Sequence, residues 1–189
     1  MGLHSSTTSW GAAAKVLHWL MAIVILVDTY IVWFIVNQDF ENFRDQSTQM
    51  FRLLMPWHKA LGFIALALLI LRLVWRQIDT RPAYPATMTP WQRTASSLAQ
   101  NGLYGLIAVS ILTGWARVSS NGSPANVFNW FTLPAIVPKD EALHAWTEIL
   151  HDWSSWAIIA IAAIHAAAAL KHHFIDRDNV LRSMLPFMR

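Results

Sequence analysis

Two histidines within one long apolar stretch are the residues best suited to bind a cofactor. His151 and His165 stand 14 residues apart, and residues 157–164 between them carry no polar side chain. On an α-helix this spacing lies within roughly 40° of four whole turns, so both imidazoles leave one face, about 21 Å apart along the axis. Two imidazoles so placed in a membrane helix predict one ligand for each of two metal centres, one near each side of the bilayer.

The composition places the chain in the membrane class. Its 189 residues are 55% hydrophobic and only 13% charged, whereas soluble domains carry about 25% charged residues. Eleven tryptophans suit a protein that is anchored at two water interfaces. The net charge is only +3, and the basic residues lie at the ends of the apolar stretches, which indicates membrane topology and not a nucleic-acid partner.

The absence of cysteine narrows the chemistry further. It excludes disulfides, cysteine zinc sites, iron–sulfur clusters and covalent haem attachment through C-x-x-C-H. Any haem must therefore be held non-covalently. Residues 1–10 show no basic region followed by a small-residue cleavage site, so we expect no removable signal peptide.

Four apolar stretches are long enough for membrane spans, which need about 20 residues each. They cover residues 11–36, 51–76, 92–118 and 142–173. The predicted fold is an all-α membrane protein, a four-helix transmembrane bundle that forms a single domain over residues 1–189. The longest connection, residues 119–140, is expected at the membrane interface or as a short surface helix.

Lysine and arginine predict the orientation of this bundle, because cytoplasmic loops carry an excess of them. The side that holds both termini collects Lys15, Arg72, Arg76, Arg81, Arg93, Lys171, Arg177, Arg182 and Arg189. The other side collects Arg44, Arg52, Lys59, Arg117 and Lys139, next to most of the acids. Nine against five predicts that both termini are cytoplasmic.

With this orientation the histidines fall into two pairs by depth. His18 lies near the inner end of the first stretch, and His58 near the outer end of the second. The fourth helix runs inward, so His151 is outer and His165 is inner. We therefore expect His18 to pair with His165 and His58 with His151. A six-coordinate haem iron with histidine on both faces fits such pairs, although a single intramembrane histidine is as readily explained by a hydrogen bond between helices.

Short motifs surround these histidines. The first stretch has Leu-His-Trp-Leu at residues 17–20, and the second has His58-x3-Gly62-x9-Arg72-x3-Arg76. In the fourth, His165 is followed by four alanines and a leucine, then by His-His at 172–173 and Asp-Asn at 178–179. Together these motifs resemble the bacterial di-haem cytochrome b561 family of inner-membrane proteins over all four helices.

The resemblance implies a cofactor set and a function. It implies two non-covalent b-type haems with two axial histidines each, His18 and His165 on the inner iron, His58 and His151 on the outer iron. Electrons would pass across the bacterial inner membrane to or from quinone. One member type is an enzyme that oxidises superoxide at the periplasmic face and reduces ubiquinone, and this is the expected function. The alternative is a relay subunit between the quinone pool and another redox protein, such as a periplasmic partner.

A third class, a histidine-lined metal transporter, would need a polar path between the two histidine levels. Residues 157–164 offer no side chain that could carry an ion, so this class is disfavoured. Besides quinone and superoxide, the expected partners are membrane lipids.

Arg72 and Gly62 are the next candidates for cofactor binding. Arg72 stands 14 residues after His58, on the same helix face and one haem level further inward. It is expected to pair with the propionates of the inner haem, or else to anchor its helix end, and Arg76 is a weaker candidate of the same kind. Gly62, one turn after His58, would let a flat macrocycle approach the backbone.

The remaining polar residues have two readings each. Asp28, deep in the first helix, would relay protons for quinone or accept a hydrogen bond from a neighbour. Lys59, Arg52 and Arg117 at the outer mouth would attract an anion such as superoxide, or would be solvated charges. Glycines 102, 105 and 114 would admit a macrocycle or pack helices.

Four further histidines are not expected to bind metal. His144 lies 21 residues, or about 31 Å, from His165, too far for both to act within one bilayer core. His172 and His173 are expected to cap or snorkel in the inner headgroup region. No role is expected for His4 in the polar start of the chain.

Overall fold

The computed structural model describes residues 2–36, 44–128 and 131–186. Four long helices dominate this part of the chain: α1 (Ala12–Val36), α2 (Arg44–Ile78), α3 (Pro90–Ser120) and α4 (Glu141–Lys171). All four are long and apolar enough to cross a membrane. The predicted helical membrane fold is therefore confirmed, with α2 starting seven residues before the predicted span.

Local signals explain where two of these helices begin. Pro90 occupies the first turn of α3, and the Gln92 side chain accepts a hydrogen bond from the Thr89 backbone N–H at 2.8 Å. At α4, the Asp140 carboxylate accepts from the Leu143 backbone N–H at 2.7 Å. Each contact satisfies a backbone donor that the first helical turn leaves without a partner.

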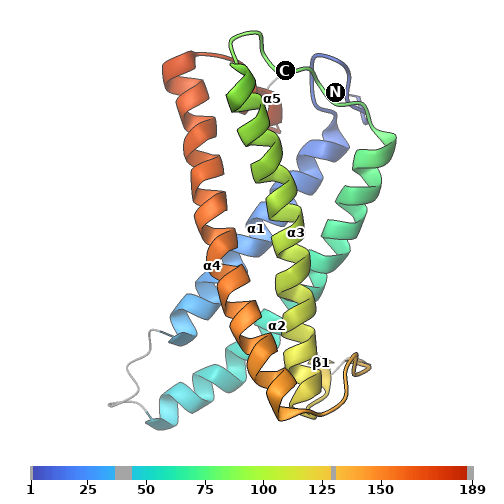
Figure 1. Ribbon diagram of the computed structural model, residues 1–189, viewed down its shortest axis with the longest axis vertical. Coiled ribbons are helices and arrows are strands. Elements are labelled where there is room, and N and C mark those ends of the chain that lie inside the picture. The colour runs from blue at the N-terminus through green and yellow to red at the C-terminus, as the bar shows by residue number, and fades with distance from the viewer. Residues whose placement is uncertain (1, 37–43, 129–130, 187–189) are drawn as a thin grey trace.

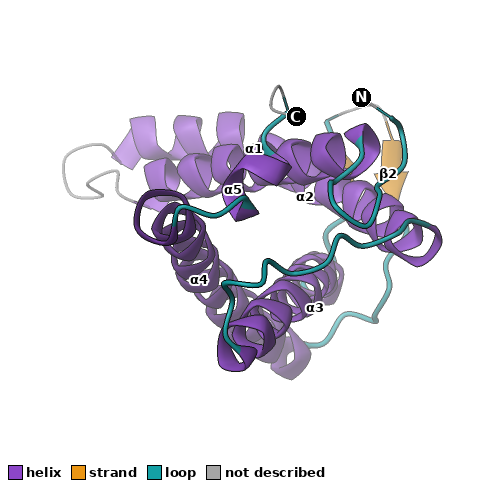
Figure 2. Ribbon diagram, turned by 90° about the horizontal axis from the view of Figure 1, so that it is seen from above, coloured by secondary structure: helices purple, strands orange, loops and turns teal. Residues whose placement is uncertain are grey.

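The helices pack as two pairs. In Figure 1, α3 and α4 run side by side, and Figure 2 shows α1 and α2 together on the opposite side of the bundle. Both chain termini lie at one end of the bundle (Figure 1), here called the terminal end. Whether this end faces the cytoplasm remains a prediction.

The connection between α3 and α4 differs from the prediction. It forms an antiparallel hairpin of β1 (Ala125–Val127) and β2 (Phe131–Leu133), with Asn126 opposite Thr132. Of the two expected forms, the short surface helix is wrong, because Val127 pairs with Phe131 and Phe128 between them adopts a left-handed φ of 47° that a helix does not allow. A position at the membrane interface stays a prediction. The end of the bundle that carries this pair of strands is here called the hairpin end.

At the terminal end, α4 continues into a short π-helix, η1 (His172–Asp176), and the chain then forms α5 (Val180–Met184). The end of α5 is attached to α1 by side chains. Trp19 donates from Nε1 to the Met184 carbonyl at 2.8 Å, and Lys15 donates from Nζ to the Leu185 carbonyl at 3.1 Å.

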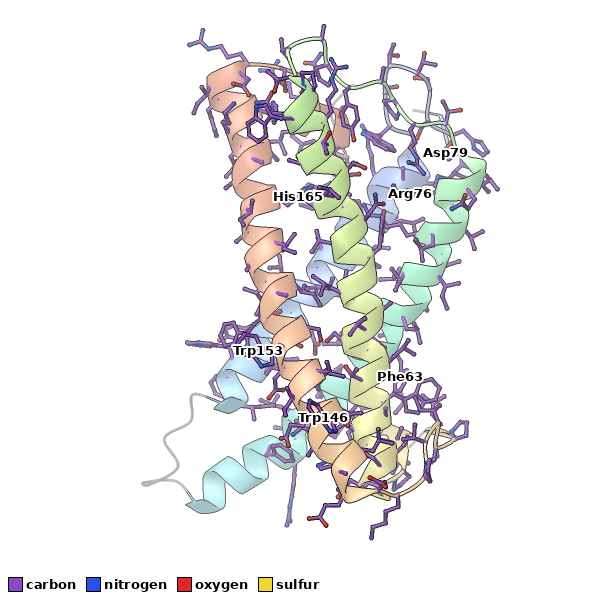
Figure 3. All side chains as sticks on the ribbon, in the orientation of Figure 1. Phe63, Arg76, Asp79, Trp146, Trp153 and His165 are labelled. Atoms are coloured by element: carbon purple, nitrogen blue, oxygen red, sulfur yellow. The ribbon has the colours of Figure 1, made fainter. Side chains whose placement is uncertain are left out.

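The buried core is small and apolar. Its central cluster has one fully buried residue from each long helix, and these are Met21, Leu69, Ile107 and Ile158. Only 6–11% of each spanning window is buried in the protein, and Trp153 points away from the bundle in Figure 3. Apolar side chains that face outward in this number suit a lipid environment.

Candidate functional site

The structure brings the four predicted histidines together as two pairs that each join different helices. The ring centres of His18 on α1 and His165 on α4 are 6.3 Å apart, with an angle of 70° between the planes. The ring centres of His58 on α2 and His151 on α4 are 6.0 Å apart, at 68°. The pairing by depth therefore matches the expected one, and α4 contributes one imidazole to each pair.

The spacing within each pair fits a metal ion between two imidazoles. An imidazole nitrogen binds a transition metal at about 2 Å and lies about 1 Å from its ring centre, so two rings on opposite sides of one ion have centres about 6 Å apart. Two neutral nitrogen ligands and no open position match a six-coordinate haem iron. The residues present thus fit a haem at each level.

An apolar layer separates the two levels. Ile158 on α4 lies seven residues after His151 and seven before His165, and it packs with Met21, Leu69 and Ile107. Side chains of this type provide no polar atom for an ion or a water chain.

The hairpin-end pair has hydrogen bonds that fix both rings. His58 Nδ1 lies 2.9 Å from Asp28 Oδ1, and His151 Nδ1 lies 2.7 Å from the Ser110 backbone carbonyl. A carbonyl or carboxylate oxygen accepts, so each Nδ1 is the N–H donor and each Nε2 keeps a lone pair for a metal. Asp28 thus accepts a hydrogen bond from a neighbouring helix, the plainer of its two predicted roles.

Gly114 on α3 makes room for the His151 ring. A Cβ atom built at this position would lie 2.9 Å from His151 Cε1 and 3.0 Å from Nδ1, closer than carbon atoms normally approach. Gly62, Gly102 and Gly105 differ, because a Cβ at each would meet nothing within 4 Å. Of these four glycines, only Gly114 lies so close to a candidate ligand that a side chain would collide with it. The other three border open space.

The terminal-end pair is surrounded by positive charge. Arg72 Nη2 lies 3.0 Å from His18 Nδ1, and the guanidinium groups of Arg72 and Arg76 lie 5.3 and 5.1 Å from the centre of the Tyr104 ring. Arg76 also donates to Asn101 Oδ1 at 2.9 Å. Tyr104 on α3 therefore contacts both arginines through its ring. No signal in the sequence predicts this contact, because α3 carries no histidine and is expected only to form a wall of the bundle.

A cavity of about 270 Å³ lies between α2 and the hairpin. It is lined by Phe51, Arg52, Met55, Pro56, Lys59, Asn126 and Phe128. Phe128 adopts a left-handed backbone conformation, with φ at 47°, and its ring packs against Trp57. Two of the three predicted outer cations, Arg52 and Lys59, thus share one cavity.

The third outer cation has a different environment. Arg117 forms an ion pair with Glu148 and lies 3.9 Å from Asp152. Its backbone carbonyl lies 3.0 Å from His144 Nδ1, so His144 joins α3 to α4 at the hairpin end, away from both histidine pairs.

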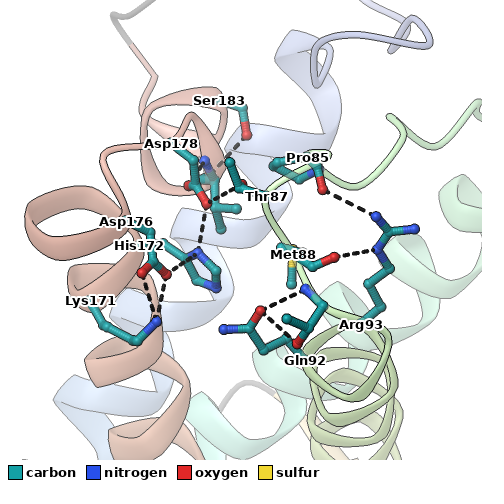
Figure 4. Close-up of polar contacts among 12 residues, drawn as sticks. Pro85, Thr87, Met88, Gln92, Arg93, Lys171, His172, Asp176, Asp178 and Ser183 are labelled. Atoms are coloured by element: carbon teal, nitrogen blue, oxygen red, sulfur yellow. Dashed lines mark hydrogen bonds and ion pairs between the residues drawn. The ribbon is translucent and has the colours of Figure 1, made fainter.

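A further polar cluster lies at the terminal end (Figure 4). His172 is buried, and its Nδ1 lies 2.7 Å from Asp178 Oδ2 and 3.1 Å from Asp176 Oδ2. Lys171 Nζ binds Asp176 at 2.6 Å, and Thr87 donates to Asp178 at 3.3 Å. The sequence predicts that His172 caps or snorkels in the inner headgroup region, whereas its side chain is buried. The four-residue spacing to Asp176 is the signal that points to this contact.

Asp79, just after α2, holds the start of the chain. Its carboxylate accepts from the Ser5 backbone N–H at 2.9 Å, from Ser5 Oγ at 2.6 Å and from Trp75 Nε1 at 3.0 Å. Burial acts to raise the Asp79 pKa, but these bonds and the contact with His4 together hold it below its ordinary value. The expectation of no role for His4 is wrong, because its ring stacks on Trp75 with centres 4.9 Å apart.

A membrane-spanning helical bundle with imidazoles paired at two levels has the architecture of a membrane cytochrome b. The family model described as "Prokaryotic cytochrome b561" matches residues 9–187. The chain belongs to this family, whose members bind haem b and transfer electrons across membranes, and it is an integral membrane protein of the oxidoreductase type.

Curated relatives are similar along nearly the whole chain. "Cytochrome b561 homolog 2" of Escherichia coli K12 is 27% identical over 186 residues, which cover 98% of this chain and 95% of the relative. "Cytochrome b561 homolog 1" of the same organism is 26% identical, covering 90% and 93%. "Probable superoxide oxidase CybB" of Yersinia pestis is 26% identical, covering 92% and 93%.

Proposed function

We propose that this protein carries electrons across the bacterial inner membrane through two haem b groups. His58 and His151 would hold the haem at the hairpin end, and His18 and His165 the haem at the terminal end. The observation that carries the proposal is the ring-centre spacing of 6.0 and 6.3 Å, which fits bis-histidine ligation at both levels.

The bound iron would supply one-electron exchange, and the chain's own residues would set its conditions. At each level two imidazoles would hold the iron, so that no substrate would need to bind the metal and electrons would move without ligand exchange. Asp28 and the Ser110 carbonyl orient the hairpin-end ligands. Apolar side chains of the core exclude water between the two levels.

Arg72 would change partners when haem is bound. A guanidinium only donates, so His18 Nδ1 accepts in the present contact and a neutral His18 carries its proton on Nε2. If Nε2 holds the metal, a neutral His18 would carry its proton on Nδ1, which could then not accept from Arg72. The released guanidinium is suited to the propionates of the terminal-end haem, and Gly62 leaves open space beside α2.

We infer that the electron donor is superoxide at the periplasmic face and that the acceptor is ubiquinone. Each superoxide anion would give up one electron and leave as dioxygen, and two electrons with two protons would convert ubiquinone to ubiquinol. The similarity to a probable superoxide oxidase supports this reading. So does the cavity with Arg52 and Lys59, which form no ion pair within the part of the chain that the structure describes. With the hairpin end at the periplasmic face, both termini would be cytoplasmic.

The alternative is a relay subunit that passes electrons between the quinone pool and a periplasmic redox protein. A cavity of about 270 Å³ is far larger than a diatomic anion, which favours a larger group on that surface. Steady-state reduction of ubiquinone by superoxide separates the two functions, because only the enzyme supports turnover with superoxide alone as donor.

The first test is the haem content of the purified protein. The reduced-minus-oxidised absorbance spectrum and pyridine haemochrome quantitation should show two low-spin b haems per chain. His151→Ala and His165→Ala should each lose one haem. No haem, or a single haem in the unsubstituted protein, would refute the two-pair assignment.

A further inference from the structure

We propose that Asp28 is a positioning residue that orients His58 toward iron and lowers the reduction potential of the hairpin-end haem below that of the terminal-end haem. This inference rests on the proposed ligand pairs and gives the electron path a direction. Asp28 is the only acidic residue of α1. A carboxylate at this depth is costly in a membrane unless it has a partner.

The partner is the imidazole of His58, and the contact is specific. Asp28 Oδ1 and His58 Nδ1 are 2.9 Å apart, and each side chain is 22% exposed. Because the carboxylate accepts, Nδ1 carries the proton and Nε2 faces away with its lone pair. The bond joins α1 to α2, so it sets both the tautomer and the orientation of the ring about its own axis.

Three of the four ligand candidates have different partners at Nδ1. His58 meets a carboxylate, His151 meets the neutral carbonyl of Ser110, and His18 meets the guanidinium of Arg72. Within the described residues, no carboxylate is hydrogen-bonded to His18 or His165. In the part of the chain that the structure describes, a negatively charged side chain is therefore hydrogen-bonded to a ligand candidate at the hairpin end only.

This asymmetry acts on the iron through the ligands. A carboxylate bonded to a ligating histidine raises the basicity of that ligand. The added electron density and the negative charge stabilise ferric iron more than ferrous iron, which lowers the reduction potential of the hairpin-end site. The terminal-end ligand candidates have no such carboxylate within the described residues. One electron placed at the hairpin end would therefore move downhill to the terminal end, the direction required for oxidation of an external donor.

The experiment uses variants that bind one haem each, so that the measured reduction potential belongs to one known haem. His165→Ala should keep the hairpin-end haem alone. Adding Asp28→Asn keeps the side-chain size and an acceptor oxygen but removes the charge. We expect the haem to stay bound and its ferric-over-ferrous preference to fall about tenfold, an upward shift of about 59 mV for one electron. Potentiometric titration of the haem absorbance measures it.

Asp152→Asn in the same single-haem protein is the matched control. Asp152 directly follows His151 but is 60% exposed and lies near Arg117, so removal of its charge should leave the potential nearly unchanged. An unchanged potential in Asp28→Asn would overturn the inference, and so would an equal shift in both variants. Either result would leave the ligand pairs intact, since the haem remains bound.

If Asp28→Asn does not retain its haem, the inference can still be tested with variants that keep Asp28. The potential of the haem in His165→Ala is compared with that in His151→Ala, which should keep the terminal-end haem alone. A lower value for the hairpin-end haem supports the inference, and an equal or higher value overturns it. Absence of haem from both single-site proteins would instead refute the ligand pairs, and the inference with them.

Discussion

Replacement of Gly114 by alanine should remove the hairpin-end haem while leaving the terminal-end haem in place. The new methyl carbon would lie 2.9 Å from His151 Cε1, whereas carbon atoms in contact are about 3.5–4.0 Å apart. The ring or α3 must therefore shift by roughly 0.6–1 Å, more than the tolerance of about 0.5 Å for a productive ligand geometry. The shift would also strain the bond from His151 Nδ1 to the Ser110 carbonyl.

The stability of the fold should change far less than the haem content. Overpacking a tight contact costs about 1–3 kcal/mol, but alanine gains about 1 kcal/mol over glycine within a helix. The net loss is therefore about 0–2 kcal/mol, which a helical membrane bundle can tolerate. The expected result is one haem per chain by pyridine haemochrome quantitation, with a far-UV circular dichroism spectrum that stays helical.

Gly102→Ala is the matched control on the same helix, because a Cβ at Gly102 meets nothing within 4 Å. It should keep the hairpin-end haem, because it adds the same methyl group to α3 without touching the His151 ring. Two haems with unchanged spectrum and potentials in Gly114→Ala would refute the reasoning, since they would show that the His151 ring does not need the space that this glycine provides.

Two further predictions concern charge. Asp79→Asn should lower the free energy of unfolding at neutral pH. It should also reduce the amount by which this free energy falls as the pH is lowered. The Asp79 pKa is depressed in the folded protein, so its contribution is complete above the ordinary value of 3.8 and is lost as the pH falls through the folded value; thermal unfolding against pH measures it. Arg52→Gln combined with Lys59→Gln should slow ubiquinone reduction by superoxide roughly tenfold at low salt and weaken its salt dependence.

Each of these two predictions has a clear contrary outcome. If stability falls as steeply with decreasing pH in Asp79→Asn as in the unsubstituted protein, the bonds from Ser5 to Asp79 do not stabilise the fold. For the cavity, Arg117→Gln is the control, because Arg117 is already paired with Glu148 and its loss should change the rate less. An equal or greater loss in Arg117→Gln would assign the attraction of the anion to another surface.

Helix periodicity explains how much of this arrangement could be predicted from the sequence. The 14-residue interval between His151 and His165 determines their shared face, and the order of the spans determines the depth of His18 and His58. Pairing by depth follows from these two facts alone, and the structure has the same pairs. Their role as iron ligands remains a prediction that the haem content tests.

The contacts that orient the ligands could not be predicted in this way, because they depend on how the helices are rotated against each other. The bond from His58 to Asp28 requires a particular rotation of α1 against α2, and the space that Gly114 leaves for His151 requires one of α3 against α4. The hairpin escaped prediction for another reason, since strands of three residues are too short to show a period of two.

With the proposed ligands, helix α4 would fix the distance between the two haems. Because one helix bears an imidazole of each pair, the distance that an electron would cross is set by about four helical turns and not by any loop. The connections at either end can lengthen, shorten or change in sequence without altering that distance. Insertion of a single residue between His151 and His165, by contrast, would turn one imidazole by about 100° away from the other and break the electron path.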